Sequence, residues 1–213
     1  VLISNLMVQT RNKADVKPNL DMVRQMVLNS LRGFNLKFKD EYGDMVLCSD
    51  AADPWRREIF PHYKHGRRKG RVDSDTDWDN IFDIMATIKK ELVDNFPYKV
   101  MHVDSAEADD IIGVLVEERQ GMERPPTLIL SSDKDFIQLQ KFDNVKQWSP
   151  LQKKFIVGDP VESLYDKTIR GDTGDGVPNI RHHHFRLRRR RNDAPRVRTR
   201  PRTRHARYSP ANG

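Results

Sequence analysis

Three short apolar runs, each followed by acidic residues, constrain most strongly what this chain can fold into. The runs cover residues 44–50, 99–103 and 127–132. Apolar residues recur at three- and four-residue intervals over residues 19–38 and 78–96, which predicts amphipathic helices. Alternating helices and strands predict an α/β fold with a largely parallel central sheet that helices flank.

The acids that follow these runs are expected to converge, because ligands gather beyond the carboxyl ends of parallel strands. With a fourth acidic motif near residue 172, the candidates are Asp50, Glu107, Asp109, Asp110, Asp133, Asp135, Asp172 and Asp175. Crowded carboxylates repel one another, and hard divalent cations with oxygen ligands relieve that repulsion. Two such ions roughly 4 Å apart can activate a water and stabilise the leaving oxygen of a phosphodiester.

Each acidic group also has an ordinary structural interpretation. Acids in the first turn of a helix interact favourably with its dipole, which would explain residues 107–110 without metal. Asp133 and Asp135 could be turn acids, and Asp50 a loop residue. Three strand ends that all carry acids, together with the fourth motif, favour one shared site.

The net charge of +7 combines two unlike parts of the chain. Residues 181–213 hold twelve Arg, no Lys and one acid, so their charge of +11 leaves −4 for the first 180 residues. Such a tail cannot bury a core and is predicted to be disordered. Its restriction to Arg favours a translated reading-frame shift, and the alternative is an arginine-rich nucleic-acid arm.

Several protein classes are excluded by composition. No run approaches the roughly 18 apolar residues of a membrane span, and residues 1–8 lack the charged leader of a signal peptide. The single cysteine, Cys48, excludes an internal disulfide framework and a cysteine-based zinc site, and its apolar neighbours predict that it is buried. We therefore expect a cytoplasmic protein in a reducing setting.

Two segments are less regular than the rest. Residues 54–75 are polar and basic without apolar periodicity, which predicts a mobile loop or a loosely helical segment. The pairs of runs at 146–148 and 154–157, around Ser149-Pro150, predict a late hairpin.

The acidic motifs also carry a family resemblance. Glu-Ala-Asp-Asp at 107–110, Ser-Asp-Lys-Asp-Phe at 132–136 and Gly-Asp-Thr-Gly-Asp-Gly-Val-Pro at 171–178 occur in order. With residues 55–57 and 145–150, they resemble the signatures of the 5′-to-3′ exonuclease and flap-endonuclease family, and they are most similar to the ribonuclease H enzymes of T-even-like tailed phages.

The resemblance covers roughly residues 1–180 and implies the organisation of the chain. It implies a PIN-like 5′-nuclease core over residues 1–158 and the start of a helix-loop-helix duplex-binding region over 159–180, followed by the tail at 181–213. The implied activity is that of a metal-dependent 5′-3′ exonuclease and flap endonuclease with ribonuclease H activity, which removes RNA primers and 5′ flaps during phage DNA replication.

The resemblance also implies a cofactor, partners and metal ligands. Two Mg²⁺ ions are expected, with Mn²⁺ able to substitute. DNA and RNA–DNA duplexes with 5′ ends or flaps are the implied substrates of a monomer, and a phage single-strand-binding protein or clamp is an implied partner. The tighter metal is assigned to Asp50, Glu107, Asp109 and Asp133, and the second metal to Asp135, Asp172 and Asp175. Helix geometry would instead pair Glu107 with Asp110, so Asp110 is expected beside the ligands.

Residues 63–71 resemble the arch of the family, which embraces a single-stranded 5′ end and here covers about residues 54–75. Lys64 and Arg67 would contact the phosphates near the scissile bond and act in catalysis, with Arg68 adding positive charge. Tyr63 would stack on a base. The alternative is a solvated basic surface.

The 171–178 motif resembles the turn of a helix-loop-helix that grips duplex backbone. Its glycines, Gly171, Gly174 and Gly176, would let backbone amides approach phosphate. The alternative is an ordinary glycine-rich turn.

One signature of the family is not found in the sequence. The first strand of the family ends in a metal-binding aspartate, and no acid precedes Asp15 here. We therefore expect this chain to be nearly inactive as it stands, and an added upstream strand ending in Asp to restore cleavage. The competing interpretations are a non-catalytic nucleic-acid-binding fragment and another PIN-like ribonuclease.

Deletion of residues 181–213 provides a test of the two basic segments. Twelve flexible arginines should bind nucleic acid regardless of its structure, with an affinity that falls steeply with salt. The deletion should remove most of this affinity in filter binding and leave any preference for a 5′ flap. Unchanged affinity and salt slope would favour the frame-shift interpretation.

Overall fold

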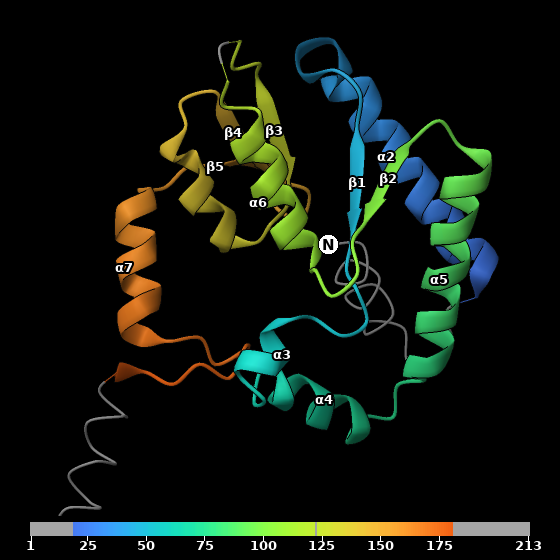
Figure 1. Cartoon of the computed structure of the whole chain (residues 1–213). Coiled ribbons are helices and arrows are strands. Elements are labelled where there is room, and N and C mark those ends of the chain that lie inside the picture. The colour runs from blue at the N-terminus through green and yellow to red at the C-terminus, as the bar shows by residue number, and fades with distance from the viewer. Residues whose placement is uncertain (1–18, 122, 181–213) are drawn as a thin grey trace, which may run out of the picture.

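Helices and strands alternate along the chain, as predicted. The computed structural model describes residues 19–121 and 123–180 (Figure 1). The predictions for residues 1–18 and for the tail at 181–213 lie outside the described residues. In chain order the elements are α2 (Leu20–Tyr42), β1 (Val46–Ser49), α3 (Arg56–Ile59), α4 (His65–Val72), α5 (Trp78–Asn95), β2 (Lys99–His102), α6 (Ala108–Glu118), β3 (Thr127–Leu130), the 3₁₀ helix η1 (Lys134–Lys141), β4 (Val145–Ser149), β5 (Lys154–Ile156) and α7 (Pro160–Arg170).

The described strands form two small sheets. β1 and β2 pair in parallel, with Cys48 opposite Met101. β3 and β4 also pair in parallel, and β4 pairs antiparallel with β5, which confirms the predicted hairpin. The predicted α/β class and largely parallel pairing are therefore confirmed, but no described strand joins the two sheets into one.

Helix α6 connects the two sheets. It contacts β1 and β2, and its Val116 packs with Ile129 of β3, Val145 of β4 and Phe136 of η1. Because the acids at 107–110 open this helix, its position between the sheets determines where the candidate site lies (Figure 1).

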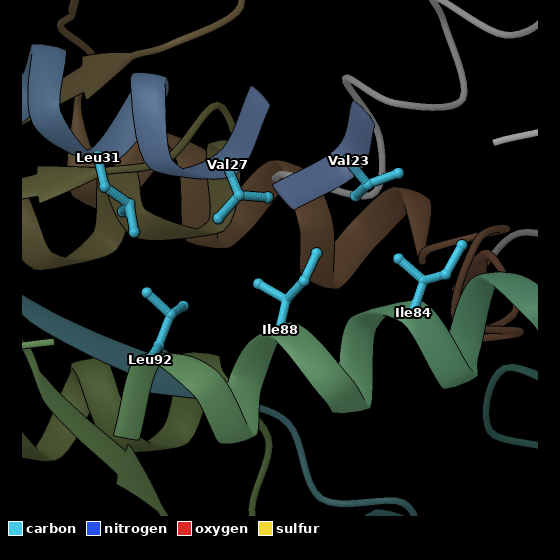
Figure 2. Close-up of a cluster of buried hydrophobic side chains, with 6 residues drawn as sticks. All are labelled: Val23, Val27, Leu31, Ile84, Ile88 and Leu92. Atoms are coloured by element: carbon cyan, nitrogen blue, oxygen red, sulfur yellow. The ribbon is translucent and has the colours of Figure 1, made fainter. Parts of the chain in front are cut away.

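A second core lies between α2 and α5. α2 begins at an Asn19 cap whose side chain accepts a hydrogen bond from the Met22 amide at 2.8 Å, and it is followed by Gly43 at φ +77°. The two helices face each other through six buried apolar side chains at helical spacing: Val23, Val27, Leu31, Ile84, Ile88 and Leu92 (Figure 2). The predicted amphipathic helices are thus confirmed.

The first strand is less buried than the sequence predicts. Val46 is 41% exposed, and Cys48 is half-buried rather than buried, although burial still raises the pKa of its thiol. The reason is that β1 has one hydrogen-bonded neighbour, β2, among the described strands. A strand in a wider sheet would be covered more completely.

The 54–75 segment is helical, in the short helices α3 and α4. Neither helix contains a buried residue, and the buried residues of this segment, Pro54 and Tyr63, lie outside them. In the part of the chain that the structure describes, no helix is long and apolar enough to cross a membrane.

Ile88→Ala tests the core between α2 and α5. Ile88 is 2% exposed, so truncation should leave a cavity and lower the free energy of unfolding by about 2–5 kcal/mol. Ile59→Ala is the matched control, because Ile59 is 75% exposed and its loss should cost less than about 0.5 kcal/mol. Urea unfolding measures both, and equal costs would contradict the assigned core.

Candidate metal and nucleic-acid site

The end of β1 is tied to the beginning of α6. The Ala51 amide donates to the carbonyl of Ala106 at 2.9 Å, and the Ala108 amide donates to Oδ1 of Asp50 at 2.7 Å. Asp50 therefore lies at the N-terminus of α6, where the exposed amides and the helix dipole favour a negative charge. The structure places Asp50 beside the 107–110 motif, as the sequence predicts.

Asp109 lies in a concentration of negative charge. The residue is exposed by surface area, yet the surrounding protein desolvates its carboxylate. Desolvation, together with the nearby charges of Asp133 and Asp50, raises the pKa of Asp109 to about 6. No hydrogen bond or ion pair of its carboxylate is found among the described residues, so this group would gain most from an added cation.

Glu107 is buried and has three hydrogen-bond donors. Its carboxylate accepts from Lys64 Nζ at 2.6 Å, Tyr63 Oη at 2.6 Å and Arg56 Nη1 at 3.2 Å. Burial alone would raise the pKa of Glu107, but Lys64 and Tyr63 outweigh it and hold the pKa below its ordinary value. The carboxylate is therefore ionised and directly contacts the basic segment at 54–75.

Asp110 has a structural role in this arrangement. Its carboxylate accepts two hydrogen bonds of 2.7 Å from the Arg56 guanidinium, one of 3.2 Å from Trp55 and one of 2.9 Å from the Glu107 amide. Arg56 chiefly lowers the pKa of Asp110. With its oxygens engaged in this way, Asp110 lies beside the candidate ligands rather than among them.

Asp133 follows β3 and is positioned by a buried amide side chain. Gln147 of β4 is fully buried and donates from Nε2 to the carbonyls of Ser131 and Asp133, at 2.9 and 2.6 Å. The Asp133 carboxylate accepts from the Asp135 amide at 3.0 Å. The polar Gln147 thus fixes the turn that presents both aspartates.

Asp135 and Asp172 are bridged by a lysine of α7. The Lys167 ammonium forms ion pairs with Oδ1 of Asp135 and, at 3.0 Å, with Oδ2 of Asp172. Lys167 mainly lowers the pKa of Asp172. The carboxylates from two distant motifs are brought together, but with a side-chain cation between them.

The 171–178 turn contacts the predicted arch directly. Arg67 donates from Nε to the carbonyl of Gly174 at 3.0 Å and pairs with Asp175 at 2.8 Å, and the Lys64 amide donates to the carbonyl of Asp175 at 3.0 Å. Burial raises the pKa of Asp175, although Lys64 and Arg67 oppose that shift. The arch and the 171–178 turn, which are expected to bind different parts of a nucleic acid, are therefore in direct contact.

Two glycines permit the close approach of these segments. Gly171 has φ +71°, and a Cβ there would lie 2.5 Å from the carbonyl oxygen of Val177. Gly176 has φ +80°, and a Cβ would lie 2.9 Å from the carbonyl oxygen of His62 in the arch. A side chain at either position would be strained, so the geometry requires glycine.

The arch residues differ in their availability. Tyr63 is 8% exposed and its hydroxyl donates to Glu107. Its predicted stacking on a base stays a prediction, and it would require the side chain to leave this position. Burial chiefly raises the pKa of Tyr63, to about 12. Arg68 is exposed. Lys64 has φ +53°, in the left-handed region that residues with a side chain seldom adopt. Such backbone conformations are concentrated at functional sites.

The donor chemistry of the site fits a hard divalent cation, although the site is not preformed. Within residues 19–121 and 123–180, no three His, Cys, Asp or Glu side chains are close enough to hold one metal ion. All the candidate ligands are carboxylate oxygens, and Asp109 lies close to other negative charges. Mg²⁺ needs only one or two protein carboxylates beside its waters. The sequence interpretation missed Lys167 and the role of Arg56, which only their contacts reveal.

Comparisons of sequence identify similar proteins. Residues 11–167 match the family described as 5′-3′ exonuclease, N-terminal resolvase-like domain. The chain is 41% identical to ribonuclease H of Enterobacteria phage T4 over 172 residues, which are 78% of this chain and 56% of that protein. It is 30% identical to a thermostable DNA polymerase I of Thermus filiformis, over 73% of this chain and 19% of the polymerase. The chain thus spans little more than half the length of the phage T4 enzyme.

Comparison of structures identifies a similar fold. The structure of the phage T5 5′-exonuclease with bound zinc matches with a TM-score of 0.65, 17% identity, and coverage of 83% of this chain and 67% of that one. A complex of the phage T5 flap endonuclease with DNA and metal ions matches with a TM-score of 0.61, 18% identity, and coverage of 77% and 62%. At 17% and 18% identity, the similarity of these structures supports the fold of this chain and not its function.

Asp109→Asn tests the charge at the beginning of α6. Because the pKa of Asp109 is about 6 in the folded state and near 4 in an unfolded chain, its ionisation should lower stability as pH rises from about 4 to 6. In EDTA, Asp109→Asn should therefore be more stable than the unmodified chain above pH 6, as measured by urea unfolding. Asp143→Asn, at an exposed acid without an ion pair among the described residues, is the control. A difference that does not vary with pH would contradict this assignment.

Proposed function

Because this chain belongs to the 5′-3′ exonuclease family, we propose that it is the core of a metal-dependent 5′-nuclease that hydrolyses phosphodiester bonds near 5′ ends. The contact between Glu107 and Lys64, beside Asp50 and Asp109, carries the proposal. A candidate metal ligand and a candidate phosphate ligand lie within 2.6 Å of each other there. Such proximity is what phosphoryl chemistry needs, since its catalysis is largely positioning and charge stabilisation.

The substrates we propose are DNA and RNA–DNA duplexes with 5′ ends or flaps, including RNA primers in phage replication. The similarity to phage T4 ribonuclease H supports this class. We assign the nuclease core to residues 1–158 and the start of the duplex-binding region to 159–180. A monomer that acts in the cytoplasm of the host, with a phage single-strand-binding protein or clamp as partner, completes the proposal.

Magnesium is the cofactor that suits these residues best, with Mn²⁺ as a substitute. We assign one ion to Asp50, Glu107, Asp109 and Asp133, and a second to Asp135, Asp172 and Asp175. Bound ions of this kind supply an activated water and stabilise the charge on the leaving oxygen. The turn after β3 and the beginning of α6 would hold the ligands on packed elements, which keeps their positions accurate.

Lys64 and Arg67 would bind and orient the phosphates next to the scissile bond. In the described conformation Lys64 pairs with Glu107, and Arg67 pairs with Asp175. Both partners are candidate metal ligands, so an added divalent charge would compete for these carboxylates and release the two basic side chains toward phosphate. Without such a charge, the Arg67–Asp175 pair would hold the arch against the 171–178 turn, and the Lys64–Glu107 pair would hold it against the beginning of α6.

The alternative function is nucleic-acid binding without cleavage. The exposed basic side chains of α4, among them Arg68, favour it. A fragment that only binds would retain affinity for single strands, and it would not cleave them with or without divalent metal. Magnesium dependence therefore separates the two functions.

Lys64→Met tests the nuclease proposal on a labelled 5′-flap duplex. The unmodified chain, however slow, should cleave in millimolar Mg²⁺ and not in EDTA, and Lys64→Met should lower the rate on the order of a hundredfold. Lys90→Met is the control, because Lys90 is a surface residue of α5 that pairs with Asp94 of the same helix. Asp133→Asn should also remove the Mg²⁺-dependent cleavage. Metal-dependent binding without any cleavage would support the alternative.

A further inference from the structure

Lys167 occupies a position for which the proposed function gives no role. It lies in the last turn of α7, which begins at an Asp159 cap, and its side chain reaches two acids from other segments. Its ammonium contacts Asp135, at the start of η1, and Asp172, in the turn after α7. The side chains of the three residues are 30–37% exposed, so water reaches this group only in part.

Lys167 is the cation that joins the two acids. Its Nζ is paired with Oδ1 of Asp135 and with Oδ2 of Asp172. Without it, two carboxylates would face each other with no cation between them, because no other ion pair of either acid is found in the described part of the chain.

We propose that Lys167 is a positioning residue, an internal counterion that holds Asp135 and Asp172 together until a divalent cation takes the place of its ammonium. This inference rests on the proposed metal-dependent function. One ammonium neutralises half of the charge of two carboxylates, whereas one divalent ion neutralises all of it. The exchange is therefore electrostatically favourable once the ion has lost part of its hydration shell.

The exchange gives Lys167 a signature that a purely structural lysine lacks. Removal of the ammonium should destabilise the metal-free chain, because Asp135 and Asp172 then repel each other. It should also strengthen divalent-metal binding, because the competing cation is gone. A lysine that only supported the fold would weaken both properties when it is replaced.

Lys167→Met and a Mn²⁺ titration test the inference. Binding of Mn²⁺ is followed by electron paramagnetic resonance of the free ion and by calorimetry, and melting is measured in EDTA and in millimolar Mn²⁺. In Lys167→Met the dissociation constant of the weaker Mn²⁺ site should fall on the order of tenfold, and the melting temperature in EDTA should fall. Lys141→Met is the matched control, because Lys141 forms an exposed pair with Glu117 away from these acids.

A second variant keeps the experiment decisive if Lys167→Met does not fold. Lys167→Arg retains the cation and should melt like the unmodified chain in EDTA, whereas Lys167→Met/Asp172→Asn, which removes the repulsion, should regain stability without recovering the competing charge. Because Asp172 is itself a proposed metal ligand, the double variant is compared in EDTA only, and a double variant no more stable than Lys167→Met would overturn the inference. Unchanged or weaker Mn²⁺ binding by Lys167→Met, with normal binding by the unmodified chain, would also overturn it and leave the proposed function intact. No Mn²⁺ binding by any variant would overturn both.

Discussion

Repulsion among carboxylates at the beginning of α6 is the constraint on which the rest of the structure depends. The fold brings acids from β1, α6 and β3 to one place, and Asp109 shows the consequence in its raised pKa. At neighbouring acids the protein opposes the repulsion with its own cations, Lys64 at Glu107 and Lys167 at Asp172. The site is therefore an array of ion pairs whose acidic halves are suited to metal and whose basic halves are suited to phosphate.

The same ion pairs hold the tertiary structure around the site. Helices α3 and α4 contain no buried residue, and the buried residues of this segment are Pro54, before α3, and Tyr63, in the turn between the helices. Arg56 joins α3 to the beginning of α6, and Arg67 joins α4 to the 171–178 turn. An arch attached by charge rather than by an apolar core can be released by other charges. Its attachment and its proposed function thus depend on the same side chains.

The sequence predicted the elements better than their assembly. Helical spacing located α2 and α5, and apolar runs located β1, β2 and β3, because local periodicity records which face of an element is buried. The division into two sheets depends on pairing between distant strands, which periodicity does not record. The burial of Tyr63 depends on Glu107, 44 residues further along the chain. Lys167 was missed because one lysine in a polar helix has no distinctive pattern, and only its two acidic partners distinguish it.

For the proposed function, electrostatics also determine the order in which metal and nucleic acid would bind. The first 180 residues carry a net charge of −4, and a nucleic acid is a polyanion, so the acidic edge alone would repel its substrate. The basic side chains that could attract phosphate, Lys64 and Arg67, are engaged with Glu107 and Asp175. Divalent cations at the carboxylates both cancel the repulsion and compete for the partners of these side chains. On the proposed function, metal binding would therefore precede productive binding of the substrate, because the metal would free the two basic side chains for phosphate.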